Sequence, residues 1–289
     1  MNSRNLTFHL LALLTVIIWG VTFVSTKVLI SAGLTPTWIF ICRFVVAYLC
    51  VMCISRKPWF ANSYLDELKM MALGLTGGSL YFITENTALE YTLASNVSLI
   101  ICAAPVLTLF FGAIVFKSRI SAKAIIGSII AILGVGMIVC NGALNLGINP
   151  LGDMLTLLAA LFWSVYCILL TRMSKRYNNL FITRKVFFYG FTTALLIALF
   201  EKKPTFIIGE NRVGVILNLL FLGIIASFLC YLMWNQCVKI LGPQTTANYI
   251  YFVPLVTILT SSLILQEPIT IWMILGGVTI ISGVYLTSK

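Results

Sequence analysis

Glu85 lies inside a mostly apolar segment, residues 68–90, that is long enough to cross a lipid bilayer. An ionised carboxylate in hydrocarbon is costly, so such a residue faces a cavity, has a cationic partner or carries a proton. Arg43, in the preceding apolar segment, falls at a similar expected depth. Two roles fit: a substrate or proton site, or a structural ion pair between two helices. Lys27 is expected to extend to the membrane surface.

Two asparagines recur at equivalent places in the chain. Asn86 follows Glu85, and Asn235 occupies the matching position in the second half. A buried amide needs partners for both its donor and its acceptor, so both residues are candidates for substrate contact. The alternative is that each amide joins neighbouring helices by hydrogen bonds.

Aromatic residues accompany these polar groups in several of the apolar segments. An aromatic and amide lining suits an amphipathic organic solute better than an inorganic ion, although a belt at the membrane surface is the alternative. The candidate substrate-binding residues are Trp19, Arg43, Tyr81, Glu85, Asn86, Trp163, Tyr166, Tyr231, Trp234, Asn235 and Asn248. Glu85 is also the candidate for proton coupling.

The composition requires a membrane protein around these residues. Of the 289 residues, 60% are hydrophobic and 9% charged, and the mean hydropathy is +1.04. A helical span needs roughly 20 apolar residues. The sequence predicts an all-α polytopic protein with ten spans, at 6–30, 35–54, 68–90, 92–116, 122–141, 151–171, 181–200, 213–238, 244–265 and 269–287.

The basic residues predict the orientation of these spans. Most Lys and Arg residues fall in alternate loops, on the side that carries both chain ends. By the positive-inside rule this pattern places both termini in the cytoplasm, which requires an even number of spans. The net charge of +11 is explained by this asymmetry and is not a nucleic-acid signature.

The chain also repeats itself. A shift of 149 residues places Asn86 on Asn235, Pro105 on Pro254 and, near the ends, Gly127 on Gly276 and Gly134 on Gly283. Matching helices are five spans apart, and because five is odd the second copy is inserted upside down. We therefore predict two inverted five-helix repeats, residues 1–142 and 150–289, joined by a short turn-rich linker. Inverted repeats are typical of transporters with a central site.

The repeated prolines and glycines have different expected roles. Pro105 and Pro254 interrupt their helices and free the carbonyls of Ile101 and Ile250. They are candidate hinges, and a static kink is the alternative. The repeated glycines predict close helix packing.

Taken together, these features resemble the drug/metabolite transporter superfamily, EamA type. The resemblance rests on the paired halves, Trp19-Gly20, the Asn-to-Pro spacing, the Gly-x6-Gly rows and the acidic junction at 265–270. The first copy departs from it with Lys-Ser-Arg at 117–119. The resemblance implies a multi-pass carrier in a bacterial inner membrane, often an exporter of amino acids or related solutes, with a cavity between the repeats.

Other functions lack their motifs. The sequence has no phosphate-binding Gly-x4-Gly-Lys-Ser/Thr loop and no His-Glu-x-x-His or Gly-x-Ser-x-Gly motif, and its single histidine cannot build a zinc site. We expect no cofactor, no metal, no enzymatic activity and no nucleic-acid partner. The expected partners are a small-molecule substrate, the lipid bilayer and, with coupling at Glu85, a proton. The expected function is secondary transport of small organic metabolites such as amino acids; the alternative is multidrug efflux by the same fold.

Overall fold

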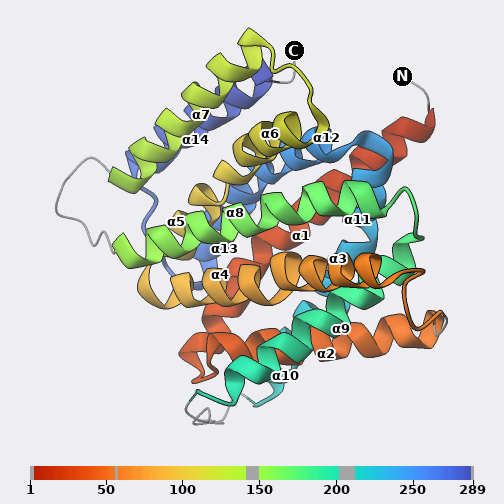
Figure 1. The fold of residues 1–289 in the computed structure, drawn as a ribbon. Helices are drawn as coiled ribbons and strands as arrows, with labels where there is room; N and C mark the ends of the chain where they lie inside the picture. The colour runs from red at the N-terminus through yellow and green to blue at the C-terminus, as the bar shows by residue number, and fades with distance from the viewer. Residues whose placement is uncertain (1–2, 56–57, 141–149, 202–211, 288–289) are drawn as a thin grey trace.

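The computed structural model describes residues 3–55, 58–140, 150–201 and 212–287, and all regular structure within them is helical (Figure 1). The elements of the first half are α1 (Ser3–Ser31), α2 (Pro36–Ile54), α3 (Tyr64–Gly74), η1 (Leu75–Ser79), α4 (Leu80–Tyr91), α5 (Ala94–Ile100), α6 (Ala103–Phe116) and α7 (Ala122–Cys140). The second half contains α8 (Pro150–Met173), α9 (Asn179–Ala198), α10 (Arg212–Leu220), η2 (Phe221–Leu229), α11 (Cys230–Leu241), α12 (Pro243–Ala247), η3 (Asn248–Phe252), α13 (Val253–Ile264) and α14 (Ile271–Thr287). The predicted linker, 141–149, lies outside the described residues.

Seven helical runs of the described chain are long and apolar enough to cross a membrane: Leu6–Ser31, Pro36–Ile54, Ala94–Phe116, Pro150–Met173, Asn179–Ala198, Arg212–Leu241 and Pro243–Ile264. Two shorter apolar helices lie at Ala122–Gly134 and Ile271–Gly283. The run from α3 to α4, which carries Glu85, is less apolar and does not belong to the seven. The all-helical, multi-span character expected from the composition is confirmed.

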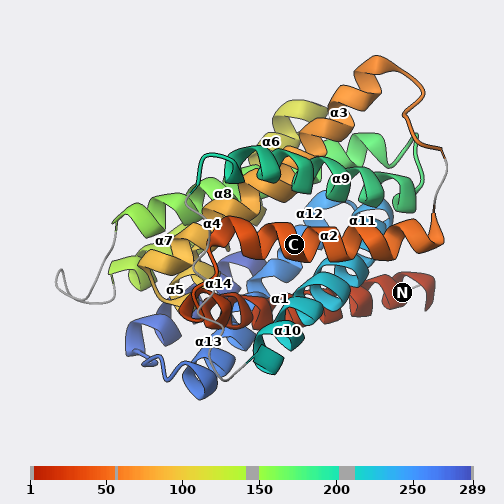
Figure 2. The same ribbon diagram turned by 90° about the horizontal axis from the view of Figure 1, so that it is seen from below.

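The helix starts follow from local sequence. Thr35, Ser63 and Asn178 have extended backbones, and their side chains accept hydrogen bonds from backbone N–H groups in the first turns of α2, α3 and α9. Pro36 at the first position of α2 fits because no helical N–H is needed there. These caps fix the ends of helices that pack side by side, such as α2 and α9 (Figure 2).

The two halves depart from regular α-helix at matching positions. The π-helical turn η1 corresponds, after the 149-residue shift, to part of η2. Helix α6 begins after a turn just before Pro105, and α13 begins after the 3₁₀ turn η3, just before Pro254. The carbonyls of Ile101 and Ile250 accept local bonds from the N–H groups of Ala104 and Val253. They are therefore paired, and the prediction that these carbonyls are free was wrong.

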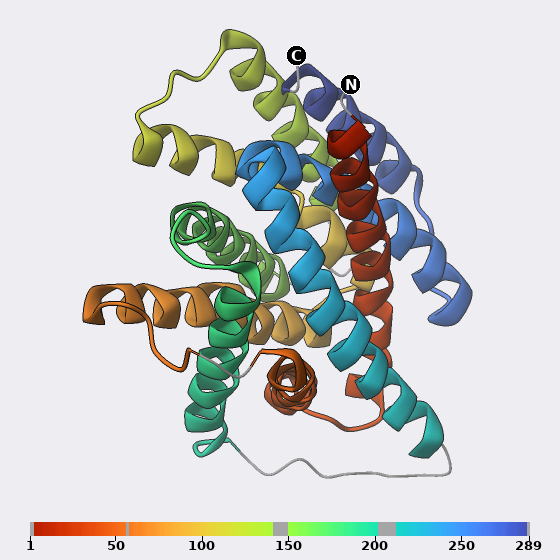
Figure 3. The same cartoon turned by 90° about the vertical axis from the view of Figure 1, so that its right-hand side faces the viewer.

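Helices α7 and α14 pack together along the repeated glycines. A Cβ atom added at Gly134 would lie 2.7 Å from the carbonyl oxygen of Gly276, and one at Gly283 would lie 2.5 Å from that of Gly127. The contacts run in opposite order along the two helices, so α7 and α14 are antiparallel. The predicted glycine packing is confirmed. The pair forms one edge of the bundle, away from α2 and α9 (Figure 3).

Gly283→Ala should destabilise the protein, because the new methyl group would also lie 2.6 Å from the backbone nitrogen of Ala131. Overpacking of this kind costs about 1–3 kcal/mol. We expect a lower apparent melting temperature in detergent. Gly277→Ala is the matched control, because a Cβ there meets nothing within 4 Å. Equal melting temperatures for the two variants would contradict the glycine contact.

Candidate functional site

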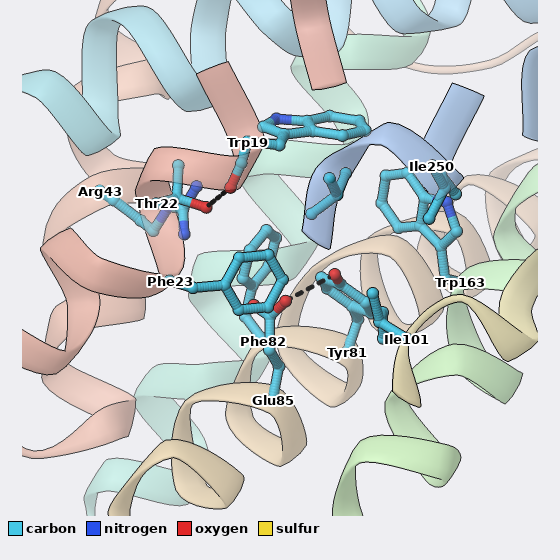
Figure 4. Close-up of a pocket in the computed structure, with 11 residues that line it drawn as sticks. Trp19, Thr22, Phe23, Arg43, Tyr81, Phe82, Glu85, Ile101, Trp163 and Ile250 are labelled. Atoms are coloured by element: carbon cyan, nitrogen blue, oxygen red, sulfur yellow. Dashed lines mark hydrogen bonds between the residues drawn. The ribbon is translucent and has the colours of Figure 1, made fainter. Parts of the chain in front are cut away.

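A cavity lies near the middle of the bundle, where α1, α2, α4 and α8 meet the interrupted helices α5–α6 and α12–α13 (Figure 4). It is lined by Trp19, Thr22, Phe23, Arg43, Tyr81, Phe82, Glu85, Ile101, Trp163, Ile250 and Val253. The space between these residues is about 450 Å³, but only about 30 Å³ of it can hold the centre of a water molecule. The cavity is therefore contracted, and an organic solute needs the surrounding helices to separate.

Matching residues of the two halves meet at this cavity. Ile101 and Ile250 are related by the 149-residue shift, and both line it. Trp19-Gly20 resembles Trp163-Ser164 at a looser shift of 144 residues, and the two tryptophan rings meet edge to face with their centroids 5.2 Å apart. The site thus lies where the two copies face one another.

Arg43 is almost fully buried, with 1% of its surface exposed. Its Nε donates a hydrogen bond of 2.9 Å to Ser227 Oγ, and its guanidinium lies 4.2 Å from the centroid of the Phe82 ring. The ring face attracts the cation but satisfies none of its N–H groups. Within the described chain the two Nη groups have no hydrogen-bond partner, so they are available to an acceptor in the cavity.

Glu85 is also buried, and its Oε1 accepts a hydrogen bond of 2.7 Å from the Tyr81 hydroxyl (Figure 4). It forms no ion pair with Arg43 within 4.0 Å, in a part of the chain that is fully described. The direct structural ion pair between α2 and α4 is therefore not formed. The structure instead places a cation and a carboxylate around one cavity without joining them.

Neither repeated asparagine lines the cavity. Asn86 Nδ2 donates to the carbonyl of Pro36 at 3.2 Å. Asn235 accepts from the Tyr166 hydroxyl at 2.6 Å and donates to Thr183 Oγ1 at 2.9 Å. Both amides hold helices together in this conformation, which is the alternative role that their positions suggested.

The remaining candidate residues lie in two other places. Tyr166, Tyr231 and Trp234 are fully buried, and their rings contact Trp163 in tilted or edge-to-face arrangements beside the cavity rather than on its surface. Asn248 lines a different pocket, together with Tyr249 and Tyr251. Of the predicted substrate-binding residues, Trp19, Arg43, Tyr81, Glu85 and Trp163 lie on the cavity.

Sequence reasoning missed several lining residues, namely Thr22, Phe23, Phe82 and Val253 as well as the side chains of Ile101 and Ile250. Two signals were available. Phe82 is three residues before Glu85 and therefore on the same helix face. The two isoleucines are related by the repeat, and repeated residues converge at the interface of the copies. Phe23 and Val253 carry no distinguishing feature in the sequence.

A second polar cluster closes one end of the bundle, beyond the cavity. Lys27 Nζ donates to the carbonyl of Thr92 at 2.8 Å and pairs with Glu267 at 3.3 Å. Glu267 also accepts from the backbone N–H groups of Ala94 and Ser95, at 2.9 and 3.1 Å, and from the Ser95 hydroxyl at 2.7 Å. Lys27 is therefore bonded to residues at this end of the bundle, with 23% of its side chain exposed, and its extension to the membrane surface stays a prediction.

Glu267 lies in the connection between α13 and α14, outside the spans. Burial raises its pKa, but the N–H groups of Ala94 and Ser95, the Ser95 hydroxyl and the charge of Lys27 outweigh burial and lower the pKa below its ordinary value. The equivalent residue of the first copy is Ser118, which has no charge. The ionic cluster around Glu267 therefore has no charged equivalent at the matching position of the first copy.

Comparison with known proteins agrees with this architecture. Residues 6–140 and 150–289 each match the EamA-like transporter family. An uncharacterized transporter of Archaeoglobus fulgidus is 29% identical over 100% of this chain and 98% of its own length. A protein of Escherichia coli K12 named a probable amino-acid metabolite efflux pump is 26% identical over 96% of this chain and 93% of its own. A crystal structure with 17% identity covers 98% of this chain and 97% of its own, with a TM-score of 0.68, and shows the same fold.

Glu267→Ala should destabilise the protein by about 2 kcal/mol, since it leaves two buried N–H groups and Lys27 without their acceptor. Glu90→Ala, an exposed carboxylate on α4, is the control. Apparent melting temperatures in detergent measure the difference.

Melting temperatures measured over a range of pH test whether the ionised form of Glu267 provides this stabilisation. The lowered pKa means that this stabilisation is complete above the ordinary Glu pKa of about 4.3 and is lost as the pH falls through the folded value. The difference between wild type and Glu267→Ala should shrink progressively as the pH falls below about 4.3. A constant difference down to pH 3 would show that the ionised carboxylate is not what stabilises this end.

Proposed function

We propose, from the premise that this chain belongs to the EamA-like transporter family, that it is a secondary transporter of small organic metabolites. Transport occurs by alternating access through the cavity between the two copies, in the direction of export. The observation that carries the proposal is the cavity itself, where Arg43 and Glu85 are buried without pairing with one another.

The proposed topology has ten spans in two inverted repeats, residues 1–142 and 150–289, with both termini in the cytoplasm of a bacterial cell and the spans in its inner membrane. The antiparallel contact of α7 with α14 supports the inversion, because matching residues exchange places across it. A second pair of contacts supports it too. Ser164 Oγ donates to the carbonyl of Ala104 at 2.9 Å, and a Cβ at Gly20 would lie 3.0 Å from the carbonyl oxygen of Val253, the equivalent of Ala104.

The substrate that fits best is a zwitterion with an apolar body, such as an amino acid. The free Nη groups of Arg43 suit a carboxylate, which guanidinium binds with two parallel hydrogen bonds. Glu85 suits an ammonium group, and Trp19, Trp163 and the two isoleucines suit an apolar side chain. The name of the Escherichia coli relative agrees with this class of substrate.

Glu85 also offers a route to proton coupling. A buried carboxylate without a cationic partner holds either a proton or a bound ammonium, because either one neutralises it. A proton that returns to Glu85 when the substrate leaves couples export to proton uptake.

The observed conformation is one of two that the repeat allows. Trp19 Nε1 donates to the carbonyl of Ala226, in η2, at 2.9 Å. Trp163, its counterpart in the second copy, has a buried Nε1 without a partner among the described residues. The carbonyl of Gly77, the equivalent of Ala226 in η1, accepts instead from the Tyr231 hydroxyl. In the oppositely facing state we propose that Trp163 bonds to Gly77 and that Trp19 is released. Pro105 and Pro254 act as the hinges.

Multidrug efflux remains the second candidate function, because the aromatic walls of the cavity would also accept apolar drugs. The two functions differ in their need for Arg43. A drug without a carboxylate gains no binding energy from the Arg43 guanidinium.

Glu85→Gln should remove the pH dependence of solute flux in proteoliposomes, because the amide can neither take up a proton nor attract an ammonium. Flux of labelled amino acids is measured with and without a pH gradient, beside their methyl esters, which lack the carboxylate. Wild type should transport the acid and not the ester. Glu90→Gln, an exposed position on the same helix, is the control. An unchanged pH dependence in Glu85→Gln would refute coupling at this residue, and equal flux of acid and ester would favour the multidrug candidate.

Trp19→Phe and Trp163→Phe should shift the conformational equilibrium in opposite directions, because each removes an indole N–H used in only one state. The readout is the rate at which an impermeant maleimide labels a cysteine at Thr22, on the cavity wall, in a cysteine-free background. Reagent added from either side of vesicles reports which side is open. Trp19→Phe should favour the state opposite to the observed one. If both variants shifted the equilibrium in the same direction, or neither shifted it, the proposed exchange of indole hydrogen bonds between the two states would be contradicted.

A further inference from the structure

A pocket lined by basic residues lies outside the transport cavity, at the end of the bundle that carries the N-terminus (Figure 1). Its lining is Lys69, Leu169, Arg172, Met173, Lys175 and Arg176. It offers about 390 Å³ of space for water-sized groups, far more than the transport cavity does. The pocket joins α3 of the first copy to the end of α8 in the second.

The positive charges of this pocket are only partly compensated. Asp66 pairs with Lys69 at 2.8 Å and with Arg176 at 3.2 Å. Arg172 reaches the carbonyl of Val115 at 3.4 Å, and Lys175 has no ion-pair partner among the described residues. Four cations therefore face a single carboxylate.

The neighbours of Asp66 in this pocket keep its carboxylate ionised. Its hydrogen bonds with Lys69, Tyr177 and Arg176 lower its pKa from the ordinary value against the effect of burial. The carboxylate is thus already used by two of the four cations. Arg172 and Lys175 supply the charge that remains for a ligand.

The surroundings of the pocket are apolar and exposed. Leu65, four residues before Lys69 and so on the same face of α3, is 67% exposed, and Phe116 at the end of α6 is 41% exposed beside Arg172. Apolar surface next to a cluster of cations is the arrangement found where a membrane meets water. A ligand with a phosphate and hydrocarbon chains would contact both parts.

We propose that this pocket binds the phosphate group of an anionic phospholipid, with the acyl chains along the exposed residues of α3 and α6. Arginine suits phosphate because its planar guanidinium donates two parallel hydrogen bonds. A lipid bound here contacts both copies of the repeat at one end of the bundle. It therefore stabilises the arrangement in which α3 and the end of α8 lie together.

The test compares phosphatidylglycerol, phosphatidylcholine and inorganic phosphate as ligands of the purified full-length protein in detergent. Binding is measured by native mass spectrometry and by the rise in apparent melting temperature. The variant is Arg172→Gln with Lys175→Gln, both exposed and outside the transport cavity. The control is Arg212→Gln with Lys239→Gln, which removes the same charge from other exposed sites.

We expect phosphatidylglycerol to bind and stabilise wild type and the control, and to bind the Arg172/Lys175 variant more weakly by roughly fivefold for each charge removed. Phosphatidylcholine should bind weakly to all three. Equal loss of phosphatidylglycerol binding in variant and control would overturn the site, since general charge would explain it. Inorganic phosphate that binds wild type as tightly as phosphatidylglycerol would overturn the assignment to a lipid. Solute flux by the variant verifies that it is folded.

Discussion

The burial of Arg43 is the constraint on which the rest of the structure depends. A guanidinium with 1% of its surface exposed, deep in an apolar bundle, needs compensation from its surroundings. The protein supplies it partly, through the Ser227 hydroxyl and the face of Phe82, and places Glu85 on the same cavity without contact. Both residues line the contracted cavity, where a solute that separates the surrounding helices would meet them.

In the proposed mechanism, the repeat accounts for a cavity that opens on either side. Equivalent residues meet at its walls and along α7 and α14, so the two copies are close to interchangeable in their packing. They are not interchangeable in their charges, because Glu85 is matched by Trp234 and Glu267 by Ser118. We propose that this nearly symmetric frame has two conformations of similar energy and that the unmatched charges determine which one is favoured.

Much of this was predictable because the physics of the bilayer restricts a chain to few solutions. Seven of the ten predicted span positions followed from apolar length, and the close helix contact followed from the spacing of Gly127 and Gly134. The roles of Asn86 and Asn235 did not follow, because an amide on a helix has the same sequence signature whether it faces a cavity or a neighbouring helix. The bond between Lys27 and Glu267 joins residues 240 positions apart, and no local pattern encodes it.

Counterflow in proteoliposomes tests the central claim most directly. Vesicles containing the purified protein are loaded with an unlabelled apolar amino acid and diluted into a trace of the same compound in labelled form. An alternating-access carrier with one central site exchanges the two, so the label should accumulate transiently above its external concentration and then decline. Label that only equilibrates, with no overshoot and no saturation, would contradict the account and indicate a passive pore or an unrelated function.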